Sequence, residues 1–269
     1  AILKQAEADG EIRYELRGEV ALIGLDRPHK RNAISDRVIE ALAAAVTLAE
    51  NEAKAAVIHG IGDHFCAGLD LAEHVERPIL DAIKNSRRWH AVFSMIERGS
   101  IPYVAALHGA VVGGGFELAS AVHVRVADET AFFALPEGQR GIFVGGGGSV
   151  RIGRLIGAQR MADMMLTGRV ATPEEAEAWG AVQYRTPAGG ALEKAIALAM
   201  RMAENAPMSN YAVLNALPRI QDMSAEDGLF TESLMASLTT VTPEATERLR
   251  AFLEKRAKRL DIPKDKANA

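Results

Sequence analysis

Two glutamates, Glu117 and Glu137, lie beside glycines in two short segments of the chain. Glu117 is part of VVGGGFELA at 111–119, and Glu137 is part of LPEGQRGI at 135–142. If one apolar pocket holds both carboxyl groups, their surroundings can separate their pKa values, so that one acts as a general base and the other as a general acid. The pair therefore predicts a proton-transfer site that works without a metal ion.

Glycine turns near these glutamates predict a second feature, a group of backbone N–H donors. Residues 113–115 have no side chains, so a ligand can approach their backbone closely. A helix that begins near Gly114 would present unpaired N–H groups and the positive end of its dipole. The turn DHFCAGLD at 63–70 offers another close approach at Ala67 and Gly68. Two converging N–H groups form an oxyanion hole, in which one donor typically contributes about 3–4 kcal/mol to a transition state.

Each of these signals has an ordinary structural explanation when it is taken alone. Glu117 could simply complement the dipole of its own helix, and residues 136–138 could form a surface turn. A glycine triplet often serves only a tight turn or close helix packing. The conjunction of two glutamates with two glycine turns is what favours a catalytic site.

The composition argues against several other classes of function. The chain has 269 residues, 48% of them hydrophobic, and a formal net charge of −4. This charge argues against nucleic acid or an anionic membrane as the main partner. The single cysteine, Cys66, excludes an internal disulfide framework and a cysteine zinc site. No apolar run is long enough to span a bilayer, so we expect a soluble, cytoplasmic protein, although an organelle matrix is also compatible.

Alternating strand and helix patterns predict an α/β fold. The expected strands are a hairpin within 11–25 and single strands at 55–60, 103–107, 122–127 and 131–134, with helices at 36–49 and 79–96. Helical periodicity dominates the last third of the chain, at 158–166, 173–179, 190–204, 209–219, 225–238 and 243–259. We therefore expect a core domain at 1–190 that carries the site, followed by a helical C-terminal region at 191–269.

Several motifs occur along the chain in an order that identifies a family. They are FCAGLD at 65–70, HG at 108–109 with the glycine-rich segment to 119, LPE with GI at 135–142, LTGR at 166–169, EEA at 174–176 and WG at 179–180. Together they resemble the enoyl-CoA hydratase/isomerase (crotonase) superfamily over nearly the whole chain. The resemblance implies a spiral of repeated ββα units with a helical C-terminal trimerisation region, assembled as a homotrimer or a dimer of trimers.

The resemblance also implies roles for the residues singled out above. The N–H groups of Ala67 and Gly114 would hold the thioester oxygen of an acyl-CoA substrate. Glu117 and Glu137 would be the two catalytic carboxyl groups, at the spacing found in hydratases of the family. Which of them is the acid and which is the base stays open at this point. The run GGGGS at 145–149 lacks the following lysine of a phosphate-binding loop, and the resemblance implies that it is a turn below the active site.

Further residues are expected to bind the substrate. The CoA contacts implied by the resemblance are Arg27, Lys30, Arg31, Cys66, Leu69 and, from a neighbouring subunit, Phe252 and Lys255. A solvated helix face is an equally good interpretation of Lys255, and Phe252 could pack instead of stacking. Candidates for the acyl pocket are Leu80, Ile83, Trp89, Phe93, Phe133, Phe143 and residues 208–214. No metal is expected, and no cofactor beyond the CoA moiety of the substrate.

The favoured function is a 2-enoyl-CoA hydratase of fatty acid metabolism, which adds water across the α,β double bond of an acyl-CoA. Alternatives on the same fold are an enoyl-CoA isomerase, a phenylpropenoyl-CoA hydratase-lyase, a dehydratase and a thioester hydrolase. A CoA-binding member without catalysis is a third class, which the presence of both glutamates disfavours. The length and the aliphatic or aromatic nature of the acyl chain stay open.

Overall fold

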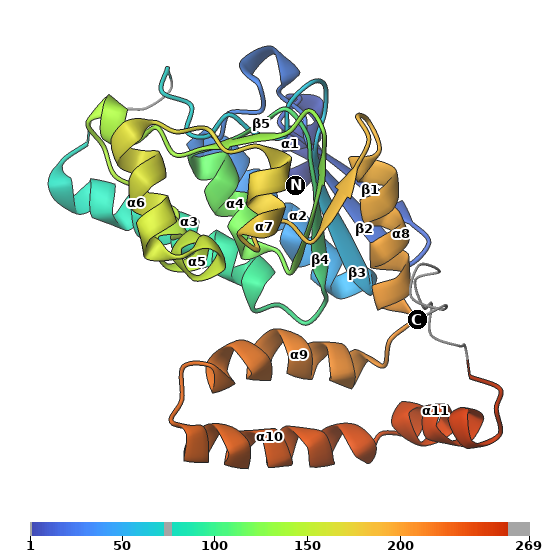
Figure 1. The fold of residues 1–269 in the computed structure, drawn as a ribbon. Helices are drawn as coiled ribbons and strands as arrows, with labels where there is room; N and C mark the ends of the chain where they lie inside the picture. Colours follow the sequence, from blue (N-terminus) through green and yellow to red (C-terminus); the bar gives the residue numbers. More distant parts are fainter. Residues whose placement is uncertain (1, 73–76, 258–269) are drawn as a thin grey trace.

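The computed structural model describes residues 2–72 and 77–257. Its main layer is a six-stranded sheet in the order β1-β2-β3-β4-β6-β8 (Figure 1). The strands are β1 (Ile12–Arg17), β2 (Val20–Leu25), β3 (Ala55–Gly60), β4 (Tyr103–Leu107), β6 (Val124–Asp128) and β8 (Tyr184–Thr186). β1 and β2 form the predicted antiparallel hairpin, and every other neighbouring pair is parallel.

A smaller parallel sheet pairs β5 (Ala110–Val112) with β7 (Phe132–Ala134). Strand–strand–helix units therefore recur along the chain: β1 and β2 lead to α2, β4 and β5 lead to α4, and β6 and β7 lead to α5. The helices of this part are α1 (Ile2–Ala8), α2 (Asp36–Glu52), α3 (Ile79–Glu97), α4 (Gly114–Ala121), α5 (Gly148–Ile156), α6 (Ala158–Thr167) and α7 (Pro173–Ala178). The repetition matches the predicted arrangement of ββα units.

One short backbone bridge brings the two predicted glycine turns together. Cys66, in the turn after β3, pairs in parallel with Val111 of β5. The Cys66 N–H donates to the Ala110 carbonyl at 2.9 Å, and the Val112 N–H donates to the Cys66 carbonyl at 3.1 Å. Gly115 lies against this bridge, because a Cβ at this position would come within 2.3 Å of the Cys66 carbonyl oxygen. Segments almost fifty residues apart are thereby held side by side at one edge of the sheets.

α8 (Ala191–Ala203) is the first helix of the C-terminal region that we expected at 191–269. It covers one face of the main sheet (Figure 1). Its buried face, which includes Ala195 and Leu198, packs with Val57 and Val104 from the central strands. The helices that lie apart from the sheet begin one element later, with α9 (Pro207–Ile220), α10 (Ala225–Thr240) and α11 (Pro243–Leu253).

Most predicted elements are present, whereas α1, α5, β5 and β8 were not predicted. α5 begins within the glycine run at 145–149, which the resemblance led us to interpret as a turn, and glycine gives a weak signal for a helix. β5 and β8 have three residues each, too few to show a periodic pattern. The helix expected at 243–259 ends at Leu253, and its last two positions lie outside the described residues. Within the described ranges, no helix is long and apolar enough to cross a membrane.

Asn32 connects the loop after β2 with the turn that follows β3. Its Oδ1 accepts the Arg27 N–H at 2.8 Å, and its Nδ2 donates to the carbonyls of Ile61 at 3.0 Å and His64 at 2.7 Å. The residue is 1% exposed and has a left-handed backbone with a φ of 57°. Asparagine tolerates this conformation better than most residues, and its amide satisfies three backbone groups that are shielded from water.

We predict that Asn32→Ala lowers the free energy of unfolding by about 2–4 kcal/mol, because three backbone groups lose their partners and alanine is strained at this φ. Urea unfolding followed by circular dichroism measures the loss. Asn51→Ala is the matched control, since the exposed Asn51 amide donates to the Thr47 carbonyl one helical turn earlier. The control should change stability by no more than about 0.5 kcal/mol, and equal losses in both variants would contradict the role of Asn32.

Candidate active site

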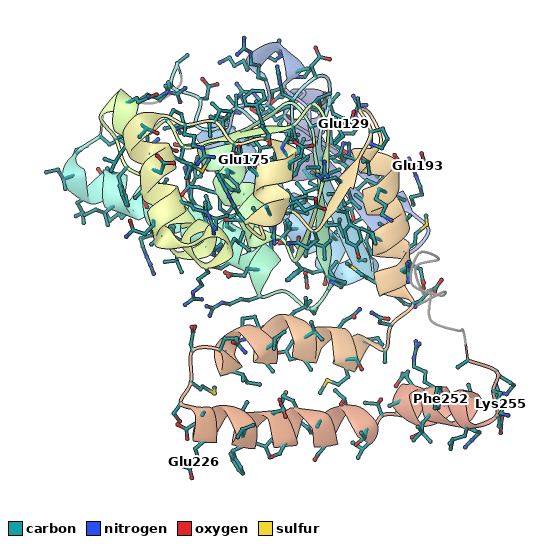
Figure 2. The ribbon with its side chains drawn as sticks, in the orientation of Figure 1. Glu129, Glu175, Glu193, Glu226, Phe252 and Lys255 are labelled. Atoms are coloured by element: carbon teal, nitrogen blue, oxygen red, sulfur yellow. The ribbon has the colours of Figure 1, made fainter. Side chains whose placement is uncertain are left out.

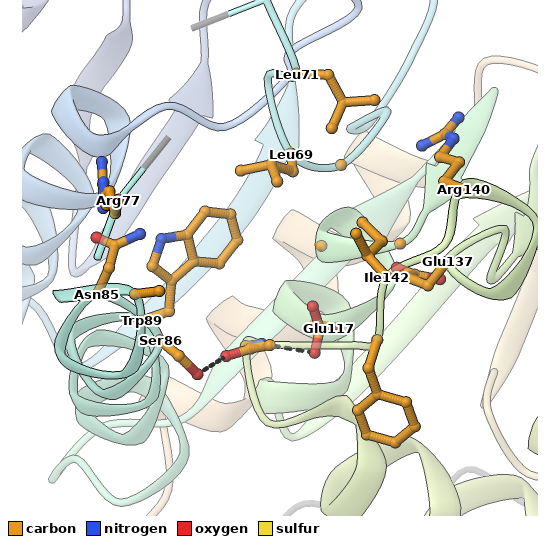
Figure 3. Close-up of a pocket in the computed structure, with 17 residues that line it drawn as sticks. Leu69, Leu71, Arg77, Asn85, Ser86, Trp89, Glu117, Glu137, Arg140 and Ile142 are labelled. Atoms are coloured by element: carbon orange, nitrogen blue, oxygen red, sulfur yellow. Dashed lines mark hydrogen bonds between the residues drawn. The ribbon is translucent and has the colours of Figure 1, made fainter. Parts of the chain in front are cut away.

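A cavity of about 340 Å³ opens where β3, β5 and β7 lead into their loops (Figure 3). Gly68 and Leu69 line it from the first loop, Gly113 and Gly114 from the second, and Glu137 from the third. Part of α3 forms another wall. Apolar groups and glycine backbone make up most of the lining, and the two predicted glutamates both face this cavity.

Glu117 is in the first turn of α4 and is 3% exposed. Its Oε1 accepts the N–H groups of Gly146 and Gly148, each at 2.8 Å. Burial raises the pKa of this carboxyl, whereas the N–H groups of Gly145, Gly146 and Gly148 and the charge of Arg151 oppose the increase. These donors stabilise the ionised form, because a backbone N–H can only donate.

Glu137 follows β7 and is 6% exposed. Its Oε2 is buried and has no hydrogen-bond partner among the described residues. Burial raises the pKa of Glu137, and the negative charge of Glu117 raises it further, against the opposing effects of the Glu137 N–H and Arg140. Burial thus raises the pKa of both carboxyl groups, but Glu137 has fewer donors that favour the ionised form than Glu117 has.

The backbone donors differ from the predicted pair in one member. The Ala67 N–H donates to the Arg31 carbonyl at 2.9 Å, so it is not available to a ligand. The N–H groups of Leu69 and Gly114 have no acceptor in the part of the chain that the structure describes. The Leu69 nitrogen is 3.5 Å from where a Cβ on Gly114 would lie, and the Gly114 nitrogen is 3.2 Å from where one on Gly68 would lie. The free donor of this turn is therefore Leu69, not Ala67.

The geometry of Gly68 explains this correction. Its φ of 95° belongs to the left-handed region that favours glycine, so the chain changes direction there. On the two sides of Leu69, the Gly68 carbonyl accepts the Ile34 N–H at 2.7 Å and the Asp70 N–H donates to the Ile34 carbonyl at 2.9 Å. The Leu69 N–H consequently points away from Ile34 and toward the cavity. Gly68 is visible in the sequence and could have indicated the free donor, because Leu69 directly follows it.

The structure places the residues that we expected to bind CoA in different surroundings. Lys30 and Arg31 lie on the surface of the loop after β2, and Leu69 lines the cavity. Arg27 is 6% exposed; it forms an ion pair with Asp70 at 3.0 Å and donates to the Ala33 carbonyl at 2.7 Å, so its guanidinium holds the loop together. Lys30 pairs with the same carboxylate at 2.9 Å.

The other CoA contacts that we expected lie away from the cavity of the same protomer. Cys66 is completely buried, and burial raises its pKa to about 12. Its side chain therefore packs in the core and cannot contact a ligand, which corrects the prediction. Phe252 and Lys255 are at the outer end of the α11 region, far from the main sheet (Figure 2). Their contact with CoA bound to a neighbouring subunit stays a prediction.

The acyl-pocket candidates are also divided by the structure. Trp89 and Phe143 line the cavity, whereas Phe93 and Phe133 are buried in the core. Leu80 and Ile83 are exposed on α3. Residues 208–214 contribute Met208, Asn210 and Tyr211 to a separate hollow beside α9. The cavity also has polar lining residues that the apolar pattern of the sequence does not reveal: Arg77, Asn85, Ser86 and Arg140.

Comparison with known proteins identifies the family. The sequence profile described as enoyl-CoA hydratase/isomerase matches residues 15–261. The chain belongs to the enoyl-CoA hydratase/isomerase family. This family is part of the crotonase superfamily, so the predicted fold class is confirmed.

Relatives match this family member along most of its length. It is 33% identical over 241 residues to the 2,3-dehydroadipyl-CoA hydratase of Escherichia coli, which covers 88% of this chain and 93% of the relative. A crystal structure from Rhodopseudomonas palustris CGA009 is 51% identical, with a TM-score of 0.89 over 91% of this chain and 95% of the other. The crystal structure of the enoyl-CoA hydratase of Bacillus anthracis is 30% identical in sequence, with a TM-score of 0.86 over 93% of this chain and 98% of the other.

We predict that Glu137→Gln stabilises the protein at neutral and alkaline pH. The folded state holds a proton on this carboxyl more tightly than the unfolded state does, because the pKa of Glu137 is raised by folding. The free energy of unfolding therefore falls as the pH rises above the unfolded-state pKa and the carboxyl loses its proton. The neutral amide avoids that loss, so the free energy of unfolding of the variant should exceed that of the wild type at pH 8. The difference should vanish near pH 4.

Urea unfolding at several pH values measures this effect. Glu129→Gln is the control, because Glu129 is exposed and its replacement removes the same charge. A Glu137→Gln variant that is less stable than the wild type at every pH would show that the Glu137 carboxylate is stabilising in the folded state.

Proposed function

We propose that this member of the family is a 2-enoyl-CoA hydratase. The observation that carries the proposal is the pair of buried carboxyl groups with different surroundings, placed at one cavity with two free backbone donors. Glu117 is surrounded by donors that favour its ionised form, and Glu137 has fewer such donors. The N–H groups of Leu69 and Gly114 face the same cavity.

The proposed reaction assigns one task to each group. The thioester oxygen accepts the Leu69 and Gly114 N–H groups, which makes the β-carbon of the enoyl group electrophilic. Glu117 takes a proton from a water molecule as the water oxygen bonds to the β-carbon. The double-bond electrons move to the thioester oxygen as an enolate, and Glu137 gives its proton to the α-carbon. Water is thereby added, and proton exchange with solvent restores both carboxyl groups.

The relatives named as hydratases, including the one for 2,3-dehydroadipyl-CoA, support this assignment. Isomerases, lyases and thioester hydrolases of the superfamily would use the same pair of backbone donors. Hydration requires two separate proton transfers, and this chain has a carboxyl group suited to each. The acyl group and the direction of the physiological reaction are not assigned by these features.

We predict that the wild type removes the conjugated absorbance of crotonyl-CoA or of a longer or aromatic enoyl-CoA. Glu117→Gln and Glu137→Gln should each lower kcat by about 10²-fold or more, because each removes a proton transfer from the transition state. Glu129→Gln, at an exposed position, should leave kcat unchanged. If none of these enoyl-CoA substrates is hydrated while a CoA thioester still binds, the proposed activity is wrong.

We also propose that the protein assembles as a homotrimer or a dimer of trimers. α10 carries exposed apolar side chains at Phe230, Leu234 and Leu238, and the exposed Val241 directly follows the helix. Their spacing of about one helical turn forms a continuous stripe, and further exposed apolar residues lie on α11. A stripe of this kind is typical of a surface that is covered by a partner.

We predict that sedimentation equilibrium gives the mass of a trimer or hexamer. Leu234→Glu should favour smaller species, because association would bury a charge. Ala236→Glu is the control, since it adds the same charge to α10 two residues further on and hence on the other side of the helix. A wild type that sediments as a monomer at micromolar concentration would contradict the assembly.

A further inference from the structure

The peptide group between Gly145 and Gly146 lies between Ser86 and the carboxyl group of Glu117. Ser86, on α3, donates its hydroxyl proton to the Gly145 carbonyl at 2.6 Å. The N–H of the same peptide group, which belongs to Gly146, donates to Glu117 Oε1 at 2.8 Å. Figure 3 shows both bonds in sequence. Ser86 is therefore connected to Glu117 through one rigid peptide plane, although the two side chains come from different helices.

In this arrangement, the hydrogen bond from Ser86 to the Gly145 carbonyl affects the hydrogen bond from the Gly146 N–H to Glu117. A donor on the carbonyl oxygen polarises the peptide group, which makes its N–H a stronger donor, because hydrogen bonds in a chain strengthen one another. The partial double bond keeps the carbonyl and the N–H in one plane, so the Ser86 bond also sets the direction of the N–H. Both effects favour an ionised carboxylate at Glu117.

The surrounding contacts leave little freedom to this peptide group. A Cβ on Gly146 would lie 3.1 Å from both Glu117 Oε2 and the Phe93 ring, so the loop contacts Glu117 through bare backbone. On the other side, Arg151 donates to the Gly146 carbonyl at 3.2 Å and is held by an ion pair with Glu97 at 2.9 Å. The loop is thus bonded at two successive carbonyls.

We propose that Ser86 is a positioning residue for Glu117 and acts through the Gly145–Gly146 peptide group. Its catalytic consequence rests on the proposed function, in which Glu117 is the base. Ser86 also borders the cavity, but its hydroxyl proton is already donated to the Gly145 carbonyl. A direct role in holding the acyl group would affect KM, whereas positioning of the base affects kcat and its dependence on pH.

The charged groups around this site must be considered in a test by pH. Glu117 faces Arg151 from α5 and Glu137 from the segment after β7, and Arg140 acts on Glu137. His90 lies on α3, with its Nε2 3.4 Å from Ser86 Oγ. Burial and the charges of Arg87 and Arg151 lower the pKa of His90, and a hydrogen bond to the Gly145 backbone opposes this decrease. Because His90 can titrate in the same range as a carboxyl with a raised pKa, a spectroscopic titration of the carboxyl group itself is needed beside the kinetics.

The test compares Ser86→Ala with the wild type in the full-length protein. We expect the acidic limb of the kcat profile to move to higher pH by about half a unit or more and kcat below neutral pH to fall by about 2- to 10-fold, with KM little changed. The infrared carboxyl band of Glu117, assigned by its loss in Glu117→Gln, should titrate at higher pH in the variant. Ser86→Thr retains a hydroxyl group and should restore both readouts.

Ser120→Ala is a matched control. The Ser120 hydroxyl also donates to a backbone carbonyl at 2.6 Å, but this carbonyl belongs to Glu117 itself, whereas Glu117 Oε1 accepts the N–H groups of Gly146 and Gly148. The control should leave the Glu117 titration and the acidic limb unchanged. The inference is overturned if Ser86→Ala titrates like the wild type, if its only defect is in KM, or if Ser120→Ala causes the same shift.

The infrared titration separates this inference from the proposed function. If the wild type hydrates no enoyl-CoA but Ser86→Ala still shifts the Glu117 band, the proposed function is wrong and the positioning role stands. If the wild type is an active hydratase and the band does not move, the positioning role is wrong and the activity stands.

Discussion

The active site depends on the parallel bridge between Cys66 and Val111. Each residue lies next to a turn that exposes one N–H group, and the bridge sets the separation and direction of these two groups. Its closeness explains why Gly115 is glycine, because a side chain there would meet the Cys66 carbonyl. Burial of Cys66 follows from the same constraint. The backbone donors are therefore prepared by the packing of two strands before any substrate binds.

Burial of two carboxyl groups in one cavity is the second constraint. Two unpaired carboxylates at close range would be costly, so their surroundings must differ. α4 and α5 supply the difference: the glycine backbone that precedes and begins α5 donates to Glu117, whereas Glu137 receives no comparable set of donors. Ser86 and Arg151 hold that glycine backbone from opposite sides. The loop at 145–148, which we expected to be only a turn, thus supplies the donors that distinguish the surroundings of Glu117 from those of Glu137.

Sequence patterns predicted the α/β class and most strands and helices, because buried strands and amphipathic helices show in the spacing of apolar residues. The motifs also singled out Glu117, Glu137 and Gly114, which the structure places at one cavity. The errors concern features without a local signal. Whether the N–H of Ala67 or that of Leu69 is free depends on bonds to residues 31 and 34, more than thirty positions away. In the same way, the apolar pattern of α8 does not say which surface it covers.

By itself the sequence determined the residue types that can do this chemistry: two carboxyl groups, and nearby glycines whose lack of a side chain leaves the backbone accessible. It could not determine their protonation preference or the partner of each backbone donor, because both depend on desolvation and on contacts between distant segments. The tertiary structure alone decided that Leu69 takes the place expected of Ala67. It also decided that Glu117 is the carboxyl surrounded by donors, since the glycines that contact it are about thirty residues further along the chain.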